Sequence, residues 1–218
     1  MILVFDLDGT LIDSLGDLAA AASELATNLG GRALTREEVS VMVGDGAGTL
    51  VRRALTAAGV NADTPSALTQ FLGIYERRLL DTTRTYDGVE EALSLAWRRA
   101  RMSVLTNKPL RPTDTILESL GLSHYFDVVI GGDSPYGRKP DPAGLQMLTG
   151  GSHKALMIGD SPVDWQTAAA AGCAFAWARY GFGAERFNGA APETAYILDK
   201  PSDLTAILDR FVAVTTGA

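Results

Sequence analysis

The sequence predicts an α/β protein in which a parallel sheet is interrupted by an inserted all-helical segment. Short, continuous apolar runs recur along the chain with helical stretches between them. Continuous runs are typical of strands that are buried on both faces of a parallel sheet, and the intervening helices supply the crossovers that parallel pairing requires. Residues 15–82 break the alternation, because no convincing strand run occurs there.

The strands of this sheet are predicted from the apolar runs. The first run begins almost at the N-terminus and is followed directly by acidic residues. The predicted strands are Ile2 to Phe5, Met102 to Leu105, Val128 to Ile130, Ala155 to Ile158, Ala174 to Trp177 and Tyr196 to Leu198.

The helices between the later strands carry start and stop signals. Asp, Ser and Pro are favoured at helix starts, and Gly is favoured just after helix ends. Each predicted helix begins shortly after a strand ends, as expected of an alternating fold. The helices are Val89 to Arg99 after Asp87, Pro112 to Leu120 before Gly121, one that starts at Pro142 after Asp141, and Pro162 to Ala171 between Ser161 and Gly172.

Residues 15–82 are predicted to form an inserted helical cap. Four helices are expected there, on the basis of apolar periodicity and capping residues. This interpretation divides the chain into an α/β core of residues 1–14 and 83–218 and a cap of residues 15–82. The cap helices are Leu15 to Leu29, a helix that leads from a Thr35/Glu38 capping box to Val43, Ala47 to Ala58 stopped by Gly59, and Pro65 to Leu80 capped by Thr64.

Composition and charge exclude several classes of protein. Of 218 residues, 46% are hydrophobic and 21% are charged, which indicates a globular chain, and a single Cys excludes a disulfide scaffold. The net charge of −7 argues against nucleic acid as the main partner. Because neither a basic leader nor a long apolar segment follows Met1, we expect a cytoplasmic protein without a membrane partner. The sequence leaves open whether it is a monomer or a homodimer.

Two carboxylates, Asp6 and Asp8, follow the first predicted strand and flank Leu7. If the extended geometry continues, their side chains share a side of the chain. Ligands of open parallel sheets bind beyond the carboxyl ends of the strands. A strand end that only caps a turn would need one Asp and Gly9, so we interpret the pair as functional.

Polar residues also follow the second and fourth predicted strands. Thr106 and Asn107 follow the second strand, Asp160 and Asp164 follow the fourth, and Lys139 lies between them in a loop with two prolines. Taken singly, each has a simpler interpretation, such as a strand-end hydroxyl, a first-turn acid favoured by the helix dipole, or a solvated cation.

A pocket that holds all four aspartates would be electrostatically unstable by itself. Two like charges ~4 Å apart repel each other by roughly 4 kcal/mol at an effective dielectric of 20, so a cation is required. Carboxylates without His or Cys nearby favour a hard ion, and Mg²⁺ fits best. Lys139 and the Thr106 hydroxyl would supply a further positive charge and a donor for phosphoryl oxygens.

Four segments resemble the motifs of the haloacid dehalogenase superfamily, and they occur in the same order along the chain. The segments are Asp6 to Leu11, Thr106-Asn107, Lys139-Pro140, and Gly159 to Ser161 with Asp164. The chain is also similar to the phosphoglycolate phosphatase group within the superfamily, at Asp13-Ser14, Gly44 to Ala47, Thr106 to Pro109, Gly131 to Asp133 and Lys139 to Pro142. The resemblance covers nearly the whole chain and implies a Rossmann-like parallel-sheet core with an inserted helical cap.

The resemblance implies an enzyme that hydrolyses small phosphate monoesters, with 2-phosphoglycolate as the best guess for the substrate. Asp6 would be the nucleophile that forms an aspartyl-phosphate. Asp8 would protonate the leaving alkoxide and then activate water. Because expulsion of a halide needs no proton, an acid at Asp8 favours phosphate esters, and we expect no dehalogenase activity.

The resemblance also implies which groups hold the metal and the phosphoryl oxygens. Mg²⁺ would be held by the Asp6 carboxylate, the Asp8 backbone carbonyl and Asp160. The phosphoryl oxygens would be held by Thr106, the Asn107 backbone and Lys139, and Asp164 would orient Lys139 or a metal-bound water.

The predicted cap resembles a lid with hinges near Ser14 and residues 82–85. Its stretch of residues 44–48 is not a Walker loop, because it lacks the Gly-Lys-Ser/Thr ending. The stretch is either a flexible turn between helices or a loop that meets the substrate at Gly44. In the second case Arg52 or Arg53 would be available for a substrate carboxylate.

Other functions remain open at this point. A sugar phosphomutase, a pyrophosphatase or a nucleotidase would use the same chemistry, although Gly159-Asp160 stands where the mutases carry an acidic pair. A catalytically silent binding module is an alternative of a different class. That alternative predicts a damaged motif, and none of the expected acids is missing.

Overall fold

The computed structural model describes residues 1–187 and 196–216 and confirms the predicted α/β class. Over these residues, six parallel strands form one sheet in the order β5-β4-β1-β6-β7-β8. All of the predicted strands are present, and their ends shift by one residue at most. They are β1 (Ile2–Phe5), β4 (Arg101–Leu105), β5 (Val128–Ile130), β6 (Ala155–Gly159), β7 (Ala174–Ala178) and β8 (Tyr196–Leu198).

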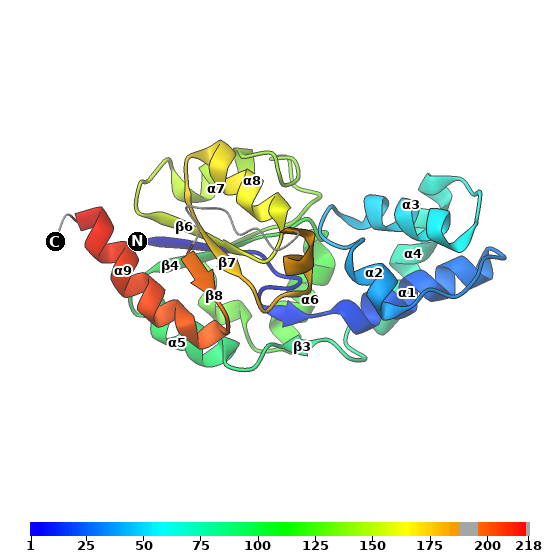
Figure 1. The fold of residues 1–218 in the computed structure, drawn as a ribbon, viewed down its shortest axis with the longest axis horizontal. Coiled ribbons are helices and arrows are strands. Elements are labelled where there is room, and N and C mark those ends of the chain that lie inside the picture. Colours follow the sequence, from blue (N-terminus) through cyan, green and yellow to red (C-terminus); the bar gives the residue numbers. More distant parts are fainter. Residues whose placement is uncertain (188–195, 217–218) are drawn as a thin grey trace.

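Helices cover both faces of the sheet, which explains why the strands are continuously apolar (Figure 1). Leu3 and Phe5 pack into a cluster with helices of one face, whereas Val4 packs into a second cluster with helices of the other. The first face is covered by α5 (Val89–Trp97), α6 (Leu110–Ser119) and α9 (Leu204–Thr216), and the second by α7 (Ala143–Thr149) and α8 (Pro162–Ala171).

The segment that lacks strands forms four helices, which lie together at one end of the molecule (Figure 1). They are α1 (Leu15–Asn28), α2 (Arg36–Ser40), α3 (Ala47–Ala58) and α4 (Thr64–Arg78). The Thr35/Glu38 capping box is present as predicted. The predicted cap of α4 was wrong by one residue, because Asp63 accepts the hydrogen bond from the Ser66 amide. The division into core and cap stays a prediction.

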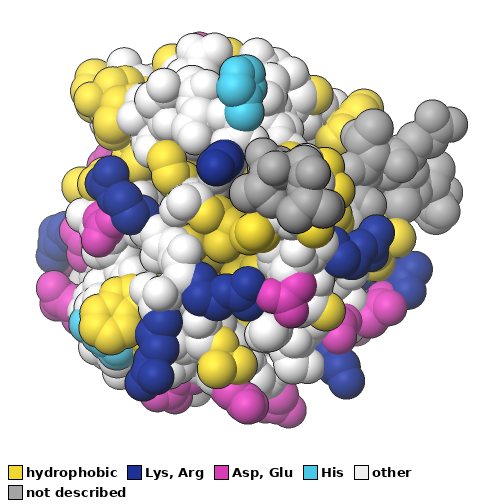
Figure 2. Space-filling view, turned by 90° about the vertical axis from the view of Figure 1, so that its left-hand side faces the viewer, with side chains coloured by type: hydrophobic (Ala, Val, Ile, Leu, Met, Phe, Trp, Pro, Cys, Tyr) yellow, Lys and Arg dark blue, Asp and Glu magenta, His cyan; other side chains and the backbone are white. Residues whose placement is uncertain are grey.

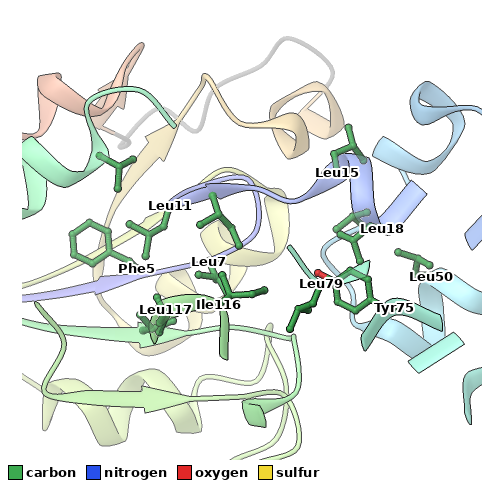
Figure 3. Packing of buried hydrophobic residues seen from close by; sticks show 14 of the residues in the cluster. Phe5, Leu7, Leu11, Leu15, Leu18, Leu50, Tyr75, Leu79, Ile116 and Leu117 are labelled. Carbon is green, nitrogen blue, oxygen red and sulfur yellow. The ribbon is translucent and has the colours of Figure 1, made fainter. Parts of the chain in front are cut away.

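One apolar cluster runs from the sheet into these four helices. Phe5 and Leu7 lie at its sheet end, and Leu18, Leu50 and Tyr75 lie at its helical end (Figure 3). The helices therefore bury their apolar faces partly against each other and partly against the edge of the sheet where β1 ends.

A two-stranded ribbon joins the sheet and the four helices, and it was not predicted from the sequence. β2 (Ile12–Asp13) pairs antiparallel with β3 (Arg84–Thr85), where the chain leaves the core and where it returns. The ribbon lies at the two places where hinges were expected.

The buried carboxylate of Asp17 ties the first turn of α1 to the segment that follows α4. It accepts hydrogen bonds from the amide and hydroxyl groups of Thr82 (2.8 and 2.6 Å) and of Thr83 (2.9 and 2.7 Å). Asp17 is 1% exposed, so water cannot replace these bonds without a local rearrangement.

Changing Asp17 to alanine is expected to destabilise the protein by about 3 kcal/mol, because four donors lose their acceptor and at least some of them stay buried. Urea unfolding measures the change. Asp63→Ala is the matched control, since it removes a single capping bond at an exposed site and is expected to cost about 1 kcal/mol. Equal losses in the two variants would show that the Asp17 clamp contributes no more than an ordinary helix cap.

Charges of both signs are interspersed on the end of the molecule opposite the four helices (Figure 2). On this face the described Lys and Arg side chains do not gather into one basic patch, in agreement with the acidic net charge. Among the described residues, no helix combines the length and the apolar character needed to cross a membrane.

Candidate active site

The sheet order brings three predicted site segments together. β1 lies between β4 and β6, with Phe5 paired to Val104 on one side and to Ile158 on the other. The residues that follow these strands therefore meet at one edge of the sheet, which is the position where parallel sheets bind ligands.

Lys139 lies at the centre of this edge and is almost completely buried. Its Nζ contacts Asp6 Oδ1 and Asp164 Oδ1, each at 2.6 Å. The other oxygen of Asp164 accepts hydrogen bonds from the Ser161 amide (3.0 Å) and hydroxyl (2.7 Å), so α8 begins with a capping box. Asp164 is thus held on both sides and fixes the position of Lys139.

Asp160 completes the acidic cluster. One carboxylate oxygen each from Asp6, Asp160 and Asp164 lie within 4.8 Å of one another. The Gly183 amide donates to Asp160 Oδ2 (2.7 Å), and among the described residues no hydrogen bond reaches Oδ1. Gly9 packs against this carboxylate so closely that a Cβ atom there would lie 1.9 Å from Asp160 Oδ2, and its φ of +89° also requires glycine.

Burial shifts the protonation of these groups. Burial, followed by the charge of Asp164, raises the pKa of Asp6 to about 7, although Lys139 opposes the change. Burial together with Asp164 and Asp6 raises the pKa of Asp160 well above its ordinary value. Burial alone would lower the pKa of Lys139, but the two carboxylates beside it hold that pKa above its ordinary value.

The residues of the cluster fit a divalent cation. When ionised, three carboxylates against one ammonium leave two uncompensated negative charges in a buried site. The cluster offers oxygen ligands only, as hard cations prefer.

Asp8 does not join this cluster, contrary to the expectation that all four aspartates converge. Its Oδ1 accepts a hydrogen bond from the Ser14 hydroxyl (2.5 Å), and its Oδ2 lies 3.0 Å from Lys108 Nζ. Ser14 is the N-cap residue of α1, but its side chain makes no capping hydrogen bond and instead donates its hydroxyl proton to Asp8. If Asp8 contributes to a metal site, only its backbone carbonyl is available.

Lys108 is a site residue that the sequence reasoning missed. Its side chain is 4% exposed, and Nζ donates to the Tyr75 hydroxyl of α4 (2.9 Å) in addition to its contact with Asp8. The signal that could have found it was present, since Lys108 directly follows two predicted site residues at the end of a strand.

Thr106 and Asn107 lie where the sequence predicted, at the end of β4. Both are buried, and the Thr106 hydroxyl accepts a hydrogen bond from the Lys108 amide (3.2 Å). The side-chain amide of Asn107 donates to the carbonyls of Gly44 (2.9 Å) and Lys139 (3.0 Å). Asn107 therefore links the loop after α2 to the loop that carries Lys139.

A small pocket of about 50 Å³ lies between the sheet edge and the four helices. Polar groups of the core and apolar side chains of the helices face each other across it. Its lining includes Asp6, Asp8, Thr106, Asn107 and Lys108 on the side of the sheet, and Leu18, Val43, Gly44, Leu50, Phe71 and Tyr75 on the side of the four helices.

The loop at Gly44 lines the pocket and is anchored by two arginines, which argues against a flexible turn, whereas contact of Gly44 with a substrate stays a prediction. Arg186 donates to the Val43 carbonyl (2.7 Å) and to Asp45 (2.9 Å), and Arg53 pairs with the same carboxylate. The structure does not bring Arg52 to the site, because this side chain is exposed and is not part of the pocket lining.

Known proteins resemble the chain over most of its length. The model of the haloacid dehalogenase-like hydrolase family matches residues 3–178. A phosphoglycolate phosphatase of Rhodospirillum rubrum is 41% identical over 194 residues, which cover 84% of this chain and 80% of the relative. One of Colwellia psychrerythraea is 35% identical over 207 residues, which cover 89% and 92%.

Solved structures of other proteins superpose on this chain over most of its length. The crystal structure of a predicted phosphoglycolate phosphatase from Haemophilus somnus superposes with a TM-score of 0.86 at 30% identity, covering 94% of this chain and 96% of the other. A haloacid dehalogenase-like family hydrolase of Streptococcus pneumoniae superposes with a TM-score of 0.81 at 21% identity, covering 94% and 97%, and shows the fold alone.

Proposed function

The chain belongs to the haloacid dehalogenase-like hydrolase family, and from this premise we propose that it hydrolyses small phosphate monoesters through an aspartyl-phosphate on Asp6. The observation that carries the proposal is the buried cluster of Asp6, Asp160 and Asp164 around Lys139, of which Asp6 also lines the pocket between the sheet edge and the four helices. The intact acidic cluster also argues against a catalytically silent binding module, which would be expected to have lost some of these acids.

The residues of the site divide the chemistry between them. Asp6 attacks phosphorus as the bond to the leaving oxygen breaks, and Asp8 gives that oxygen its proton. Lys139 and the Thr106 hydroxyl hold phosphoryl oxygens, and Asp164 keeps Lys139 in place. Asp8 then takes a proton from the water that hydrolyses the aspartyl-phosphate, which returns Asp6 to its starting state.

Mg²⁺ is the cation that we propose for the acidic cluster, with the Asp6 carboxylate, the Asp8 backbone carbonyl and Asp160 as its ligands. When bound, it offsets the negative charge that gathers on the phosphoryl group. The two uncompensated charges of the cluster support this proposal.

The first substrate to test is 2-phosphoglycolate. The names of the similar phosphatases support this choice. The cytoplasmic location expected from the sequence stays a prediction.

A screen of phosphate release tests the proposal. We expect the highest kcat/KM for 2-phosphoglycolate in a panel that also contains sugar phosphates, pyrophosphate and nucleotides. Chelation by EDTA is expected to abolish release, and Mg²⁺ is expected to restore it. Negligible release from every ester with Mg²⁺ would reject the phosphatase, whereas a clear preference for another ester would reject only the substrate.

A further inference from the structure

The pocket contains a cation that the proposed reaction does not use. Among the described residues that line it, Lys108 is the one that carries a positive charge. It lies beside Asp8, the proposed proton donor, and therefore on the side of the pocket where the leaving group must be placed.

Two hydrogen-bond donors remain available at this point. An ammonium group has three N–H donors, and the contacts of Lys108 with Asp8 Oδ2 (3.0 Å) and the Tyr75 hydroxyl (2.9 Å) use two of them. Because the Tyr75 hydroxyl accepts from Lys108, its own O–H is free to donate to another group. Burial raises the pKa of Tyr75 to about 12, so this hydroxyl keeps its proton at neutral pH.

Lys108 is a buried cation with one ionic partner among the described residues. Its ammonium is paired with the Asp8 carboxylate, and both groups are nearly buried. Because a buried charge is favourable only when it is well paired, an anion of the ligand placed beside the free N–H of Lys108 would be bound there.

Apart from Tyr75, the side chains that the four helices contribute to the pocket are apolar, among them Leu18, Leu50 and Phe71. A leaving group that carries an anion within reach of Lys108 therefore meets its charged partner at Lys108 and not on the helices.

We propose that Lys108 and Tyr75 bind a carboxylate of the leaving group, so that the site selects phosphate esters of small hydroxy acids. This inference rests on the proposed function and deepens it. It assigns the recognition of the substrate to Lys108 and to Tyr75 of α4. The sequence had instead offered Arg52 or Arg53 of α3. Arg53 is engaged by Asp45, and Arg52 lies outside the pocket.

A comparison of two esters tests the assignment. 2-Hydroxyethyl phosphate has the length of 2-phosphoglycolate but a neutral end. The unmodified protein is expected to prefer 2-phosphoglycolate in kcat/KM, and Lys108→Met is expected to reduce that preference by about 30-fold or more, because a charged group loses its partner in a buried site. Tyr75→Phe should reduce it less and in the same direction. Lys154→Met, at an exposed lysine, is the matched control and should leave the preference unchanged.

A binding experiment separates recognition from proton transfer. Asp8→Asn places a neutral isostere beside Lys108, as a protonated Asp8 would, and stops turnover. With Mg²⁺ present, calorimetry on Asp8→Asn is expected to show at least about 30-fold tighter binding of 2-phosphoglycolate than of 2-hydroxyethyl phosphate. Adding Lys108→Met should remove the difference, while retained binding of the neutral ester shows that the variant is folded.

Parallel losses for both esters in Lys108→Met, or equal affinities in Asp8→Asn, would overturn the assignment. These outcomes would show that Lys108 acts on Asp8 and not on the substrate. Failure of the proposed function has a different signature, since the unmodified protein would then release phosphate from neither ester, whereas the affinities in Asp8→Asn would still report on Lys108.

Discussion

Replacing Asp6 with asparagine is expected to lower kcat for phosphate release by at least about 10⁴-fold. An amide is a poor nucleophile, and removal of the group that forms the covalent intermediate eliminates both halves of the reaction. Steady-state phosphate release measures the loss, and trapping with beryllium fluoride should place a phosphoryl mimic on Asp6 in the unmodified protein and not in the variant. A kcat within tenfold of the unmodified value would reject Asp6 as the nucleophile.

The same variant is expected to be at least as stable as the unmodified protein when the metal has been removed. Asp6 has a pKa raised to about 7 by burial and by Asp164, so its ionised form destabilises the folded state. A carboxyl whose pKa is higher in the folded state than in the unfolded state reduces stability as pH rises from the unfolded value toward the folded one. In EDTA, the melting temperature of Asp6→Asn minus that of the unmodified protein should therefore be larger at pH 8 than at pH 5.

Asp209→Asn provides the matched control for this change of a carboxylate to an amide. Asp209 is exposed and pairs with Arg99 far from the site. Its replacement is expected to leave kcat unchanged because the residue lies far from the site. It is also expected to change stability little, because an exposed ion pair contributes little to stability. A large loss of activity in both variants would mean that the assay reports unfolding.

The placement of the acidic cluster could be predicted from the sequence because it depends on local features. A buried strand ends where its apolar run ends, and the carboxyl ends of parallel strands share one edge of the sheet. Asp6, Thr106 and Asp160 each follow such a run, so their convergence required only the correct strand order. Asp164 follows from the helix that begins after β6, where it completes the capping box with Ser161.

The contacts between the four helices and the sheet could not be predicted in the same way. The pair of Lys108 with Tyr75 and the clamp of Asp17 on Thr82 join residues that are 33 and 65 positions apart. Which side chains meet between the four helices and the sheet depends on how these two parts pack against each other. A charge pattern read along one helix contains no information on this placement, which is why an exposed arginine of α3 was expected in the pocket where Lys108 lies.

The strands β2 and β3 and the helix α9 were not predicted. The strands β2 and β3 have two residues each, and a run of that length has no recognisable periodicity. Helix α9 did have a signal, because Leu204, Ile207, Leu208 and Phe211 recur at helical spacing and are all buried.

Changing Lys139 to methionine is expected to have the second largest effect, on activity and on stability together. The variant would leave Asp6 and Asp164 buried without their shared cation, and breaking a buried ion pair by removing one partner destabilises by about 3–5 kcal/mol. The same ammonium is proposed to hold the phosphoryl group, so kcat/KM should fall by at least about 10³-fold. Urea unfolding and phosphate release measure the two losses, with Lys154→Met as the exposed control.

A double variant separates the two roles of Lys139. In Lys139→Met/Asp164→Asn one of the stranded carboxylates is neutral, and the asparagine carbonyl can still accept the hydrogen bonds from Ser161. Stability is therefore expected to recover by about 1–3 kcal/mol relative to the single variant, because removal of an unpaired buried charge relieves most of the penalty. Activity is not expected to recover, since the phosphoryl group still lacks its cation. Recovery of both would show that Lys139 serves only to keep the acidic cluster folded. Recovery of neither would show that the unpaired charge of Asp164 is not what destabilises the single variant.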